Sequence, residues 1–220
     1  MERNVIAYNE ALNRAYRESG SIESLEKLVV SETLSPIGDY GNAVKLIRDS
    51  YPRTVSFRLL ILGALWTIDC CPWEQSFECL DILNSMYPFL PAHHKAMIDF
   101  LNADRIWQRG GPQYKDDPLY EEYLRRSVEG DSACLRSRRL LADLYQTHSP
   151  RKSVALYEEI LAGIEEVFTT ERLSELGMDH FCDPENCIKE FVLGTHVTFL
   201  AYDEISANYS KLKKQLKIGT

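Results

Sequence analysis

Apolar residues recur at intervals of three and four positions along nearly the whole chain, a pattern typical of helices that bury one face. The first stripe runs from Val5 to Tyr16, a break follows at Ser19-Gly20-Ser21, and the same spacing then resumes. Over the whole chain, this pattern predicts ten or eleven helices. They cover residues 3–18, 21–33, 39–50, 54–71, 73–86, 91–109, 118–129, 132–147, 150–168, 170–176 and 184–217.

Prolines and small polar residues mark where many of these helices begin. Proline is tolerated in the first helical turn because the N–H at that position has no partner within the helix. Asp117, Ser149 and Asp183 each precede such a proline, and we expect their side chains to cap the helix that follows. Asp39 is expected to do the same after the break at residues 35–38.

Strand signals are weak throughout the sequence. The best candidate, His196 to Phe199, lies inside a longer helical pattern, and no Asn-Gly or Asp-Gly pair joins two alternating segments. The chain is therefore predicted to be all-α, and the short connections between its helices favour antiparallel helical hairpins.

The segment from Arg138 to Leu161 has the most regular hairpin pattern. It reads Leu141-Ala142-x-x-Tyr145, a turn at 146–149, and then Ser153-x-x-x-Tyr157-x-x-Ile160-Leu161. This pattern resembles the tetratricopeptide repeat, which carries leucine, a small residue and tyrosine in its first helix, and a small and an aromatic residue in its second. A less regular occurrence of the same pattern contains Leu62-Gly63-x-x-Trp66, followed by Ser76, Leu80, Leu83 and Pro88.

The resemblance implies stacked helical hairpins, which bury a continuous core and leave a concave surface that commonly binds another polypeptide. The aromatic positions Trp66, Trp107 and Tyr145 lie 41 and 38 residues apart, however, against about 34 in the repeat. An irregular helical bundle, in which the same spacing reflects core packing alone, is the alternative.

Length and composition favour a globular protein of one domain. The 220 residues are 45% hydrophobic and 26% charged, which excludes wholesale disorder. We expect a single domain over 1–220, with a candidate sub-boundary at the Gly110-Gly111-Pro112 loop. The longest apolar run, Leu59 to Trp66, is too short to cross a membrane. With no signal-peptide core and six cysteines expected to be free thiols, we predict a cytoplasmic protein.

The chain is acidic, with 25 Lys or Arg against 33 Asp or Glu and a net charge of −8. This balance argues against general binding to nucleic acid, which depends on neutralising phosphates, and favours a basic protein partner. Between Ser153 and Ile188, Arg172 is the single base among nine acidic residues. A solvated helix face is the alternative interpretation. The predicted docking residues in this segment are Glu158, Glu159, Glu165, Glu166, Glu171, Glu175 and Asp179.

The strongest candidates for a metal site are His180, Cys182, Cys187 and His196, because structural zinc is closed by four cysteine and histidine ligands. A continuous helix would hold Cys187 and His196 about 13 Å apart, too far for one ion unless it breaks at Gly194. We therefore predict no metal and no cofactor, and expect buried thiols beside a capped helix start.

Signals for catalysis are equally weak. Cys70-Cys71 is expected to be a core pair, and His93-His94 to have a surface or packing role. No phosphate-binding loop, G-x-G-x-x-G, H-E-x-x-H or G-x-S-x-G pattern occurs, so no enzymatic activity is predicted.

The pattern as a whole predicts a non-catalytic protein that binds a protein partner, most simply a basic one. In physical type, though not in motif, it is similar to the immunity proteins of bacterial toxin systems, which neutralise basic nuclease toxins by charge-complementary docking. A regulatory adaptor or peptide-binding scaffold that uses a concave groove is the alternative, and a zinc-stapled domain or zinc enzyme is a third.

Overall fold

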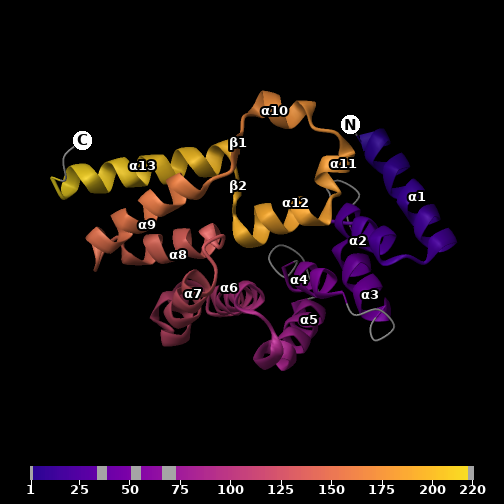
Figure 1. The fold of residues 1–220 in the computed structure, drawn as a ribbon, viewed down its shortest axis with the longest axis horizontal. Helices are drawn as coiled ribbons and strands as arrows, with labels where there is room; N and C mark the ends of the chain where they lie inside the picture. The colour runs from indigo at the N-terminus through magenta and orange to yellow at the C-terminus, as the bar shows by residue number, and fades with distance from the viewer. Residues whose placement is uncertain (1, 34–38, 51–55, 66–72, 218–220) are drawn as a thin grey trace. The chain divides into compact units, whose positions relative to one another are not determined.

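A computed structural model of the protein describes residues 2–33, 39–50, 56–65 and 73–217. Over these residues the chain forms thirteen α-helices, three short 3₁₀ or π segments and two strands of three residues each, in the order that Figure 1 shows. The predicted all-α class is confirmed. No described helix combines the length and the apolar character that a membrane span requires.

The chain divides into two compact units, and the division is not where the glycine loop suggested. The first unit comprises Met1–Phe89 and Leu176–Ile188, and the second comprises Leu90–Glu175 and Lys189–Thr220. The loop Gly110-Gly111-Pro112 lies inside the second unit, where Gly111 has a φ of +52° and leads into a 3₁₀ turn against the end of the preceding helix. The expectation of a single domain stays a prediction.

The first unit is built from helices that pack on their neighbours in sequence, and from one hairpin contributed by residues 176–188. Helix α2 packs on α1 and α3, α4 packs on α5, and α12 packs on both α2 and α4. The elements are α1 (Glu2–Ser19), α2 (Ile22–Ser31), α3 (Tyr40–Ser50), α4 (Phe57–Leu65), α5 (Trp73–Met86), η1 (Tyr87–Phe89), α11 (Met178–Phe181) and α12 (Pro184–Ile188).

Helix α4 forms the centre of the first unit, because every residue from Leu59 to Leu65 is buried. Gly63 permits the close approach of its neighbours: a Cβ at this position would lie 2.8 Å from Cys79 Sγ and 3.0 Å from Ile47 Cδ1. The small residue in the Leu62-Gly63 pattern is therefore required by packing between α4, α3 and α5. Trp66 of that pattern, and Cys70-Cys71, lie outside the described residues.

The second unit is a series of helical hairpins closed by the C-terminal helix. Helix α6 packs on α7, α7 on α8, α8 on α9, and α9 on α13. Its elements are α6 (Ala92–Arg109), η2 (Gly111–Asp116), α7 (Pro118–Gly130), α8 (Leu135–Tyr145), α9 (Pro150–Gly163), β1 (Glu166–Phe168), α10 (Thr170–Glu175), η3 (Lys189–Leu193), β2 (His196–Thr198) and α13 (Phe199–Gln215).

The repeat-like positions of the α8–α9 hairpin face its core. Leu141, Ala142 and Tyr145 of α8 and Tyr157 of α9 are all buried, and Tyr157 is fully enclosed. Ser153 is also fully buried, and its hydroxyl donates to the carbonyl of Ala142 at 2.8 Å. The spacing that suggested a repeat therefore reflects a closely packed hairpin, while membership of the tetratricopeptide family stays a prediction.

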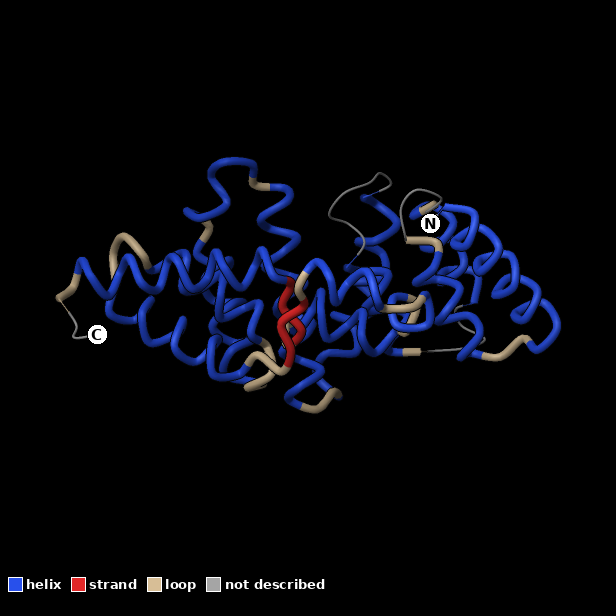
Figure 2. Tube along the Cα trace, turned by 90° about the horizontal axis from the view of Figure 1, so that it is seen from above, coloured by secondary structure: helices blue, strands red, loops and turns tan. Residues whose placement is uncertain are grey.

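Two helices expected from the pattern are shorter than predicted, and strands take their place. The helix predicted over 150–168 ends at Gly163, and the helix predicted over 184–217 is interrupted between α12 and α13. Strands β1 and β2 pair in parallel, with Val167 opposite Val197, and Figure 2 shows them side by side. Gly194, at a φ of +73°, turns the chain out of the helix into β2. Pairing between segments about 30 residues apart thus overrides the local helical pattern.

The predicted helix caps are confirmed at three of four positions. The carboxylates of Asp39, Asp117 and Asp183 accept hydrogen bonds from the backbone N–H groups of Asn42, Leu119 and Asn186, at 2.9 to 3.0 Å. Ser149 precedes α9 without making a side-chain cap bond. Carboxylates therefore start these helices, as the interaction with the helix dipole favours.

Candidate functional site

The acidic residues predicted to form one docking surface belong to several elements of the chain. Glu158 and Glu159 lie on α9, Glu165 precedes β1, and Glu166 lies in β1. Glu171 and Glu175 belong to α10. These six belong to the second unit, whereas Asp179 lies on α11 in the first unit.

Most of the six glutamates in the second unit are engaged by cations or hydroxyl groups of that unit. Glu159 accepts from Nε of Arg138 at 3.0 Å, and Glu165 lies 2.9 Å from Nε2 of His196. Glu158 accepts from the hydroxyl of Tyr209 at 2.8 Å.

Two further ion pairs complete this compensation. Glu166 lies 3.7 Å from Arg172, the single base of the acidic segment. Lys189, the first residue of η3, lies 4.0 Å from Glu165. The acidic run in the sequence is therefore largely balanced by bases that the fold brings to it from elsewhere in the second unit.

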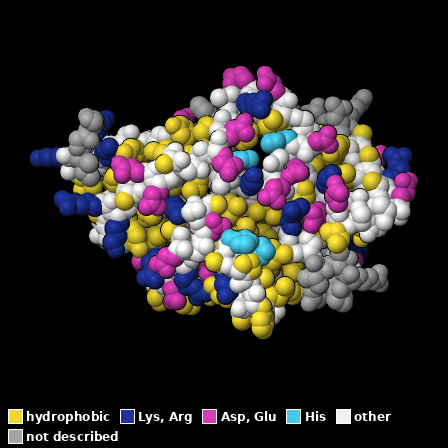
Figure 3. Space-filling view, viewed as in Figure 1, with side chains coloured by type: hydrophobic (Ala, Val, Ile, Leu, Met, Phe, Trp, Pro, Cys, Tyr) yellow, Lys and Arg dark blue, Asp and Glu magenta, His cyan; other side chains and the backbone are white. Residues whose placement is uncertain are grey.

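The negative charge of the protein belongs almost entirely to the first unit. Residues 1–89 and 176–188 contain 8 Lys or Arg against 15 Asp or Glu, whereas residues 90–175 and 189–220 contain 17 against 18. Figure 3 shows Lys and Arg side chains crowded at the end of the molecule where α13 finishes. The net negative charge is therefore concentrated in the first unit.

Four carboxylates of the first unit lie around α2 and the α11–α12 hairpin, and we call them the acidic face: Glu23, Asp179, Asp183 and Glu185. Lys27 donates to Glu23 at 3.0 Å, and that hydrogen bond and the charge of Glu23 raise the pKa of Lys27. The charges of Asp183 and Asp179 raise it further. One lysine therefore stands among three of the four carboxylates.

Two contacts fix the α11–α12 hairpin to the rest of the first unit. Arg58 of α4 donates to Glu26 of α2 at 3.0 Å and to Glu185 of α12 at 3.2 Å. The hydroxyl of Tyr8 on α1 donates to Asp179 on α11 at 2.5 Å. Burial and this bond raise the pKa of the Tyr8 hydroxyl. Segments some 150 residues apart in sequence thus form one surface, and the sequence carried no signal for their meeting.

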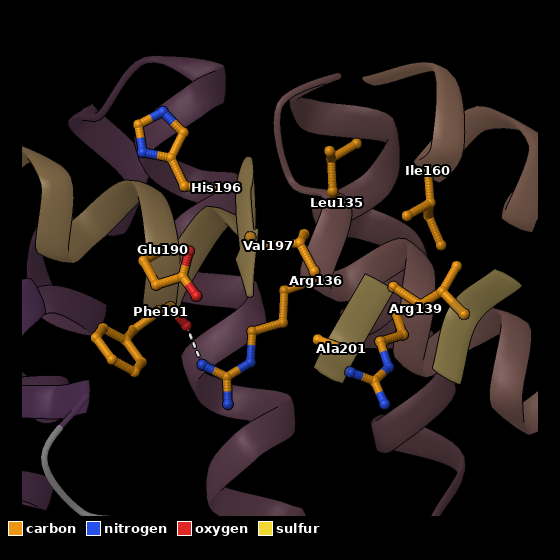
Figure 4. A pocket seen from close by; sticks show the side chains of 11 residues that line it. Leu135, Arg136, Arg139, Ile160, Glu190, Phe191, His196, Val197 and Ala201 are labelled. Atoms are coloured by element: carbon orange, nitrogen blue, oxygen red, sulfur yellow. Dashed lines mark hydrogen bonds between the residues drawn. The ribbon is translucent and has the colours of Figure 1, made fainter. Parts of the chain in front are cut away.

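A small cavity lies in the second unit at the junction of α8, α9, η3, β2 and α13. Its volume is about 200 Å³, and Figure 4 shows its lining. The guanidinium groups of Arg136 and Arg139 of α8 both point downward in the view, and Glu190 and His196 lie to the left of them. The remaining lining is mainly aliphatic and aromatic: Leu135, Ile160, Phe191, Val197, Ala201 and Ile205.

Arg136 is held beside this cavity by the segment that precedes β2. Its guanidinium donates to the carbonyl of Phe191, and its charge stands 5.1 Å from the ring centre of Phe100. Burial lowers the pKa of Arg136, and the carboxylates of Asp104 and Glu190 oppose that shift. Gly194 lies so close that a Cβ there would be 3.0 Å from the backbone nitrogen of Arg136.

The same segment bears on the alternative of a peptide-binding groove. Residues 189–193 form a π-helix that packs on both α6 and α8. The side of these two helices that it covers is therefore occupied by the chain itself, and the groove interpretation stays a prediction.

The candidate metal ligands do not gather into one site among the described residues. His180, Cys182 and Cys187 belong to the first unit and His196 to the second. His196 is bonded to Glu165, and His180 lies 3.3 Å from the side chain of Asn186. The described part of the chain holds no group of three or more His, Cys, Asp or Glu side chains arranged to bind a metal ion.

The described thiols are buried, whereas the histidine pair lies nearer the surface, with His93 exposed and His94 half-buried. Burial raises the pKa of the thiols of Cys79, Cys134 and Cys182 to about 12, so they are protonated at neutral pH. The rings of His93 and His94 stand edge to face at 4.2 Å, and burial together with the charge of His93 lowers the pKa of His94.

Comparison with known proteins identifies no relative. No family model, no curated protein and no solved structure matches the chain. The functional argument therefore rests on the surfaces and cavities of the two units.

Proposed function

We propose that the protein is a non-catalytic binding protein whose first unit docks a basic protein partner through the acidic face. The observation that carries this proposal is the charge division: 15 acidic residues against 8 basic ones in the first unit, and near balance in the second. This moves the docking surface away from the segment that the sequence pattern indicated. Of the predicted docking residues, Asp179 alone belongs to it.

The acidic face has the properties that charge-steered association requires. The side chains of Glu23 and Glu185 are 79% and 54% exposed, so their charges face the solvent from which a partner approaches. The Arg58 and Tyr8 contacts hold the α11–α12 hairpin in place, so the carboxylates need little ordering when a partner arrives. Such a surface raises the association rate of a cationic partner, and salt weakens the effect.

In its sharpest form the proposal concerns a basic nuclease toxin that this protein neutralises, as an immunity protein does. Nucleases that bind phosphates present cationic surfaces, and an acidic face that covers such a surface excludes the nucleic acid. This mechanism requires only that the protein and the nucleic acid compete for one surface of the toxin, and it needs no catalytic group on this chain.

The test compares two triple variants with equal charge changes. The first neutralises the acidic face by Glu23→Gln, Asp179→Asn and Glu185→Gln. Immobilised wild-type protein captures basic proteins from host lysate at low and high salt, and the retained protein is purified. Its affinity for wild type and variant is then measured as a function of salt, and its cleavage of DNA and RNA is assayed with and without the protein.

The matched control neutralises three glutamates of the sequence-predicted segment in the second unit, by Glu166→Gln, Glu171→Gln and Glu175→Gln. We expect the first variant to weaken binding at least tenfold, about 1.4 kcal/mol, and the control to leave it within a factor of about three. Equal losses in both variants would show a general charge effect, and a loss confined to the control would move docking to the second unit. A salt-insensitive partner would also contradict the proposal.

A further inference from the structure

The cavity of the second unit combines a cationic side with an aliphatic side, and the proposed docking function does not use it. Arg136 and Arg139 form the cationic side, and Ile160, Val197 and Ala201 contribute to the apolar one. A volume of about 200 Å³ is small for a drug-sized ligand, since common ligand pockets measure about 300–1,000 Å³. It suits one side chain or a small organic molecule, because an apolar cavity of about 150 Å³ already holds benzene.

The two arginines are suited to an anion that enters from outside. A guanidinium has five donors, and the bond from Arg136 to the Phe191 carbonyl uses a part of them. Arg139 is paired with Glu204 at 2.5 Å and lies 3.9 Å from Asp143. Because Glu204 is 59% exposed, its pair with Arg139 is of the surface type that contributes little stability. A ligand carboxylate can therefore replace Glu204 at Arg139.

The other charged groups at the cavity limit the ligand to a single negative charge beside an apolar body. Glu190 contributes one carboxylate to the lining, and His196 is bonded to Glu165. Glu204 and Asp143 also lie against Arg139, and the charge of Asp104 acts on Arg136, so a ligand carboxylate binds only by taking the place of Glu204. A carboxylate matches the planar fork of a guanidinium and forms paired hydrogen bonds with it.

We propose that this cavity binds a carboxylate attached to a small apolar group, with Arg136 and Arg139 on the carboxylate and Ile160, Val197 and Ala201 around the apolar group. The chemistry is shared by a small aliphatic or aromatic carboxylic acid and by the C-terminal residue of a polypeptide that ends in an apolar side chain. The site is formed within the second unit and does not depend on the acidic face of the first.

The ligand series isolates the two halves of the site. Binding of N-acetyl-leucine, N-acetyl-leucinamide and N-acetyl-glycine is measured on the full chain by NMR titration to about 10 mM. N-acetyl-leucine is expected to bind, and its amide and the glycine compound to bind at least tenfold more weakly, because each lacks one half. A five-residue peptide ending in leucine, and its C-terminal amide, show whether a polypeptide end binds more tightly than the small acid.

Three variants test the assignment on the protein side. Ala201→Leu fills the apolar side and is expected to abolish binding, and Arg139→Gln is expected to weaken it about tenfold, as loss of a charge-assisted bond does. Glu204→Gln releases Arg139 from its exposed partner, so it is expected to tighten binding. A merely structural role for these residues predicts no gain from Glu204→Gln.

Several results would overturn the proposal. They are the absence of binding by both the acid and the peptide, equal binding of acid and amide, unchanged binding in Ala201→Leu, and weaker binding in Glu204→Gln. Circular dichroism and thermal unfolding of each variant confirm that it folds. Because Arg139→Gln and Glu204→Gln alter exposed ion pairs, they remain informative if Ala201→Leu does not fold.

Discussion

Arg138 of α8 donates from its Nε to the carboxylate of Glu159 on α9, at 3.0 Å, although the arginine itself is buried. A second donor of the same guanidinium reaches the carbonyl of Ser132 at 2.7 Å. A buried guanidinium needs such partners, because an unpaired charge in the interior costs several kcal/mol. Glu159, predicted from the sequence to face a binding partner, therefore serves the stability of the hairpin.

We predict that Glu159→Ala lowers the free energy of unfolding by about 1–2 kcal/mol, because Arg138 loses its anionic partner while its contacts with the carbonyls of Ser132 and Asp131 remain. The control is Glu166→Ala, whose partner Arg172 lies 3.7 Å away and is 53% exposed. It is expected to cost less than about 0.5 kcal/mol. Urea unfolding measures both, and equal costs would show that burial of Arg138 does not determine the effect.

Most of the helices could be predicted from the sequence because their information is local. Apolar spacing placed α5 and α6 within one residue of their ends, and Asp117 marked the start of α7 through its cap. The interruption between α12 and α13 could not be predicted in the same way. It depends on Gly194 lying against α8 and on β2 pairing with β1, and neither contact is recorded in the local pattern.

The candidate site was less predictable than the fold, for a related reason. A count of charges along the sequence shows the acidic run after Ser153. It does not show that bases from other segments, such as Arg138 and Lys189, pair with glutamates of that run in the folded protein. The acidic face depends on α11 and α12 meeting α1 and α4, through the bonds from Tyr8 to Asp179 and from Arg58 to Glu185, and the sequence gives no indication of that meeting.

Ser153 is a position at which the α8–α9 hairpin is expected to be sensitive to side-chain size. It is fully buried, and its hydroxyl reaches the carbonyl of Ala142 on the opposite helix. We predict that Ser153→Leu destabilises the protein by about 1–3 kcal/mol or more, because the larger side chain must separate the two helices. Ala155→Leu, at an exposed position of the same helix, is the control and is expected to change stability by less than about 0.5 kcal/mol. Thermal unfolding of both measures the difference, and an unaffected Ser153→Leu would contradict the close packing of α8 and α9.

Gly194 and Gly20 share a left-handed backbone but differ in their surroundings. Their φ values are +73° and +60°; a Cβ at Gly194 would contact Arg136 at 3.0 Å, whereas Gly20 has no atom within 4 Å of that position. Gly20→Ala is therefore expected to cost about 1–2 kcal/mol from backbone strain alone.

We predict that Gly194→Ala costs roughly 1–3 kcal/mol more than Gly20→Ala, because it adds a collision with α8 to the same strain. Urea unfolding gives the two costs, and peptide-resolved hydrogen exchange should locate the loss of protection of Gly194→Ala in β2 and α13. Equal costs, or a loss of protection elsewhere, would show that the contact with Arg136 is readily relieved.

Because of its buried thiols, the protein is expected to lose stability as the pH rises into the alkaline range. Burial raises the pKa of Cys79, Cys134 and Cys182 from the ordinary value of 9.0 to about 12. Since the folded state keeps these thiols protonated, their contribution to stability is complete below about pH 9 and declines as the pH rises towards 12.

We therefore predict slow alkylation of all three thiols by iodoacetamide at about pH 8 until denaturant is added, because the thiolate is the reactive form. Urea unfolding should also show a smaller loss of stability between about pH 9 and 11 in the Cys79→Ala, Cys134→Ala, Cys182→Ala triple variant than in the wild type. Rapid alkylation of the native protein, or identical pH profiles for the two proteins, would place these thiols in contact with solvent.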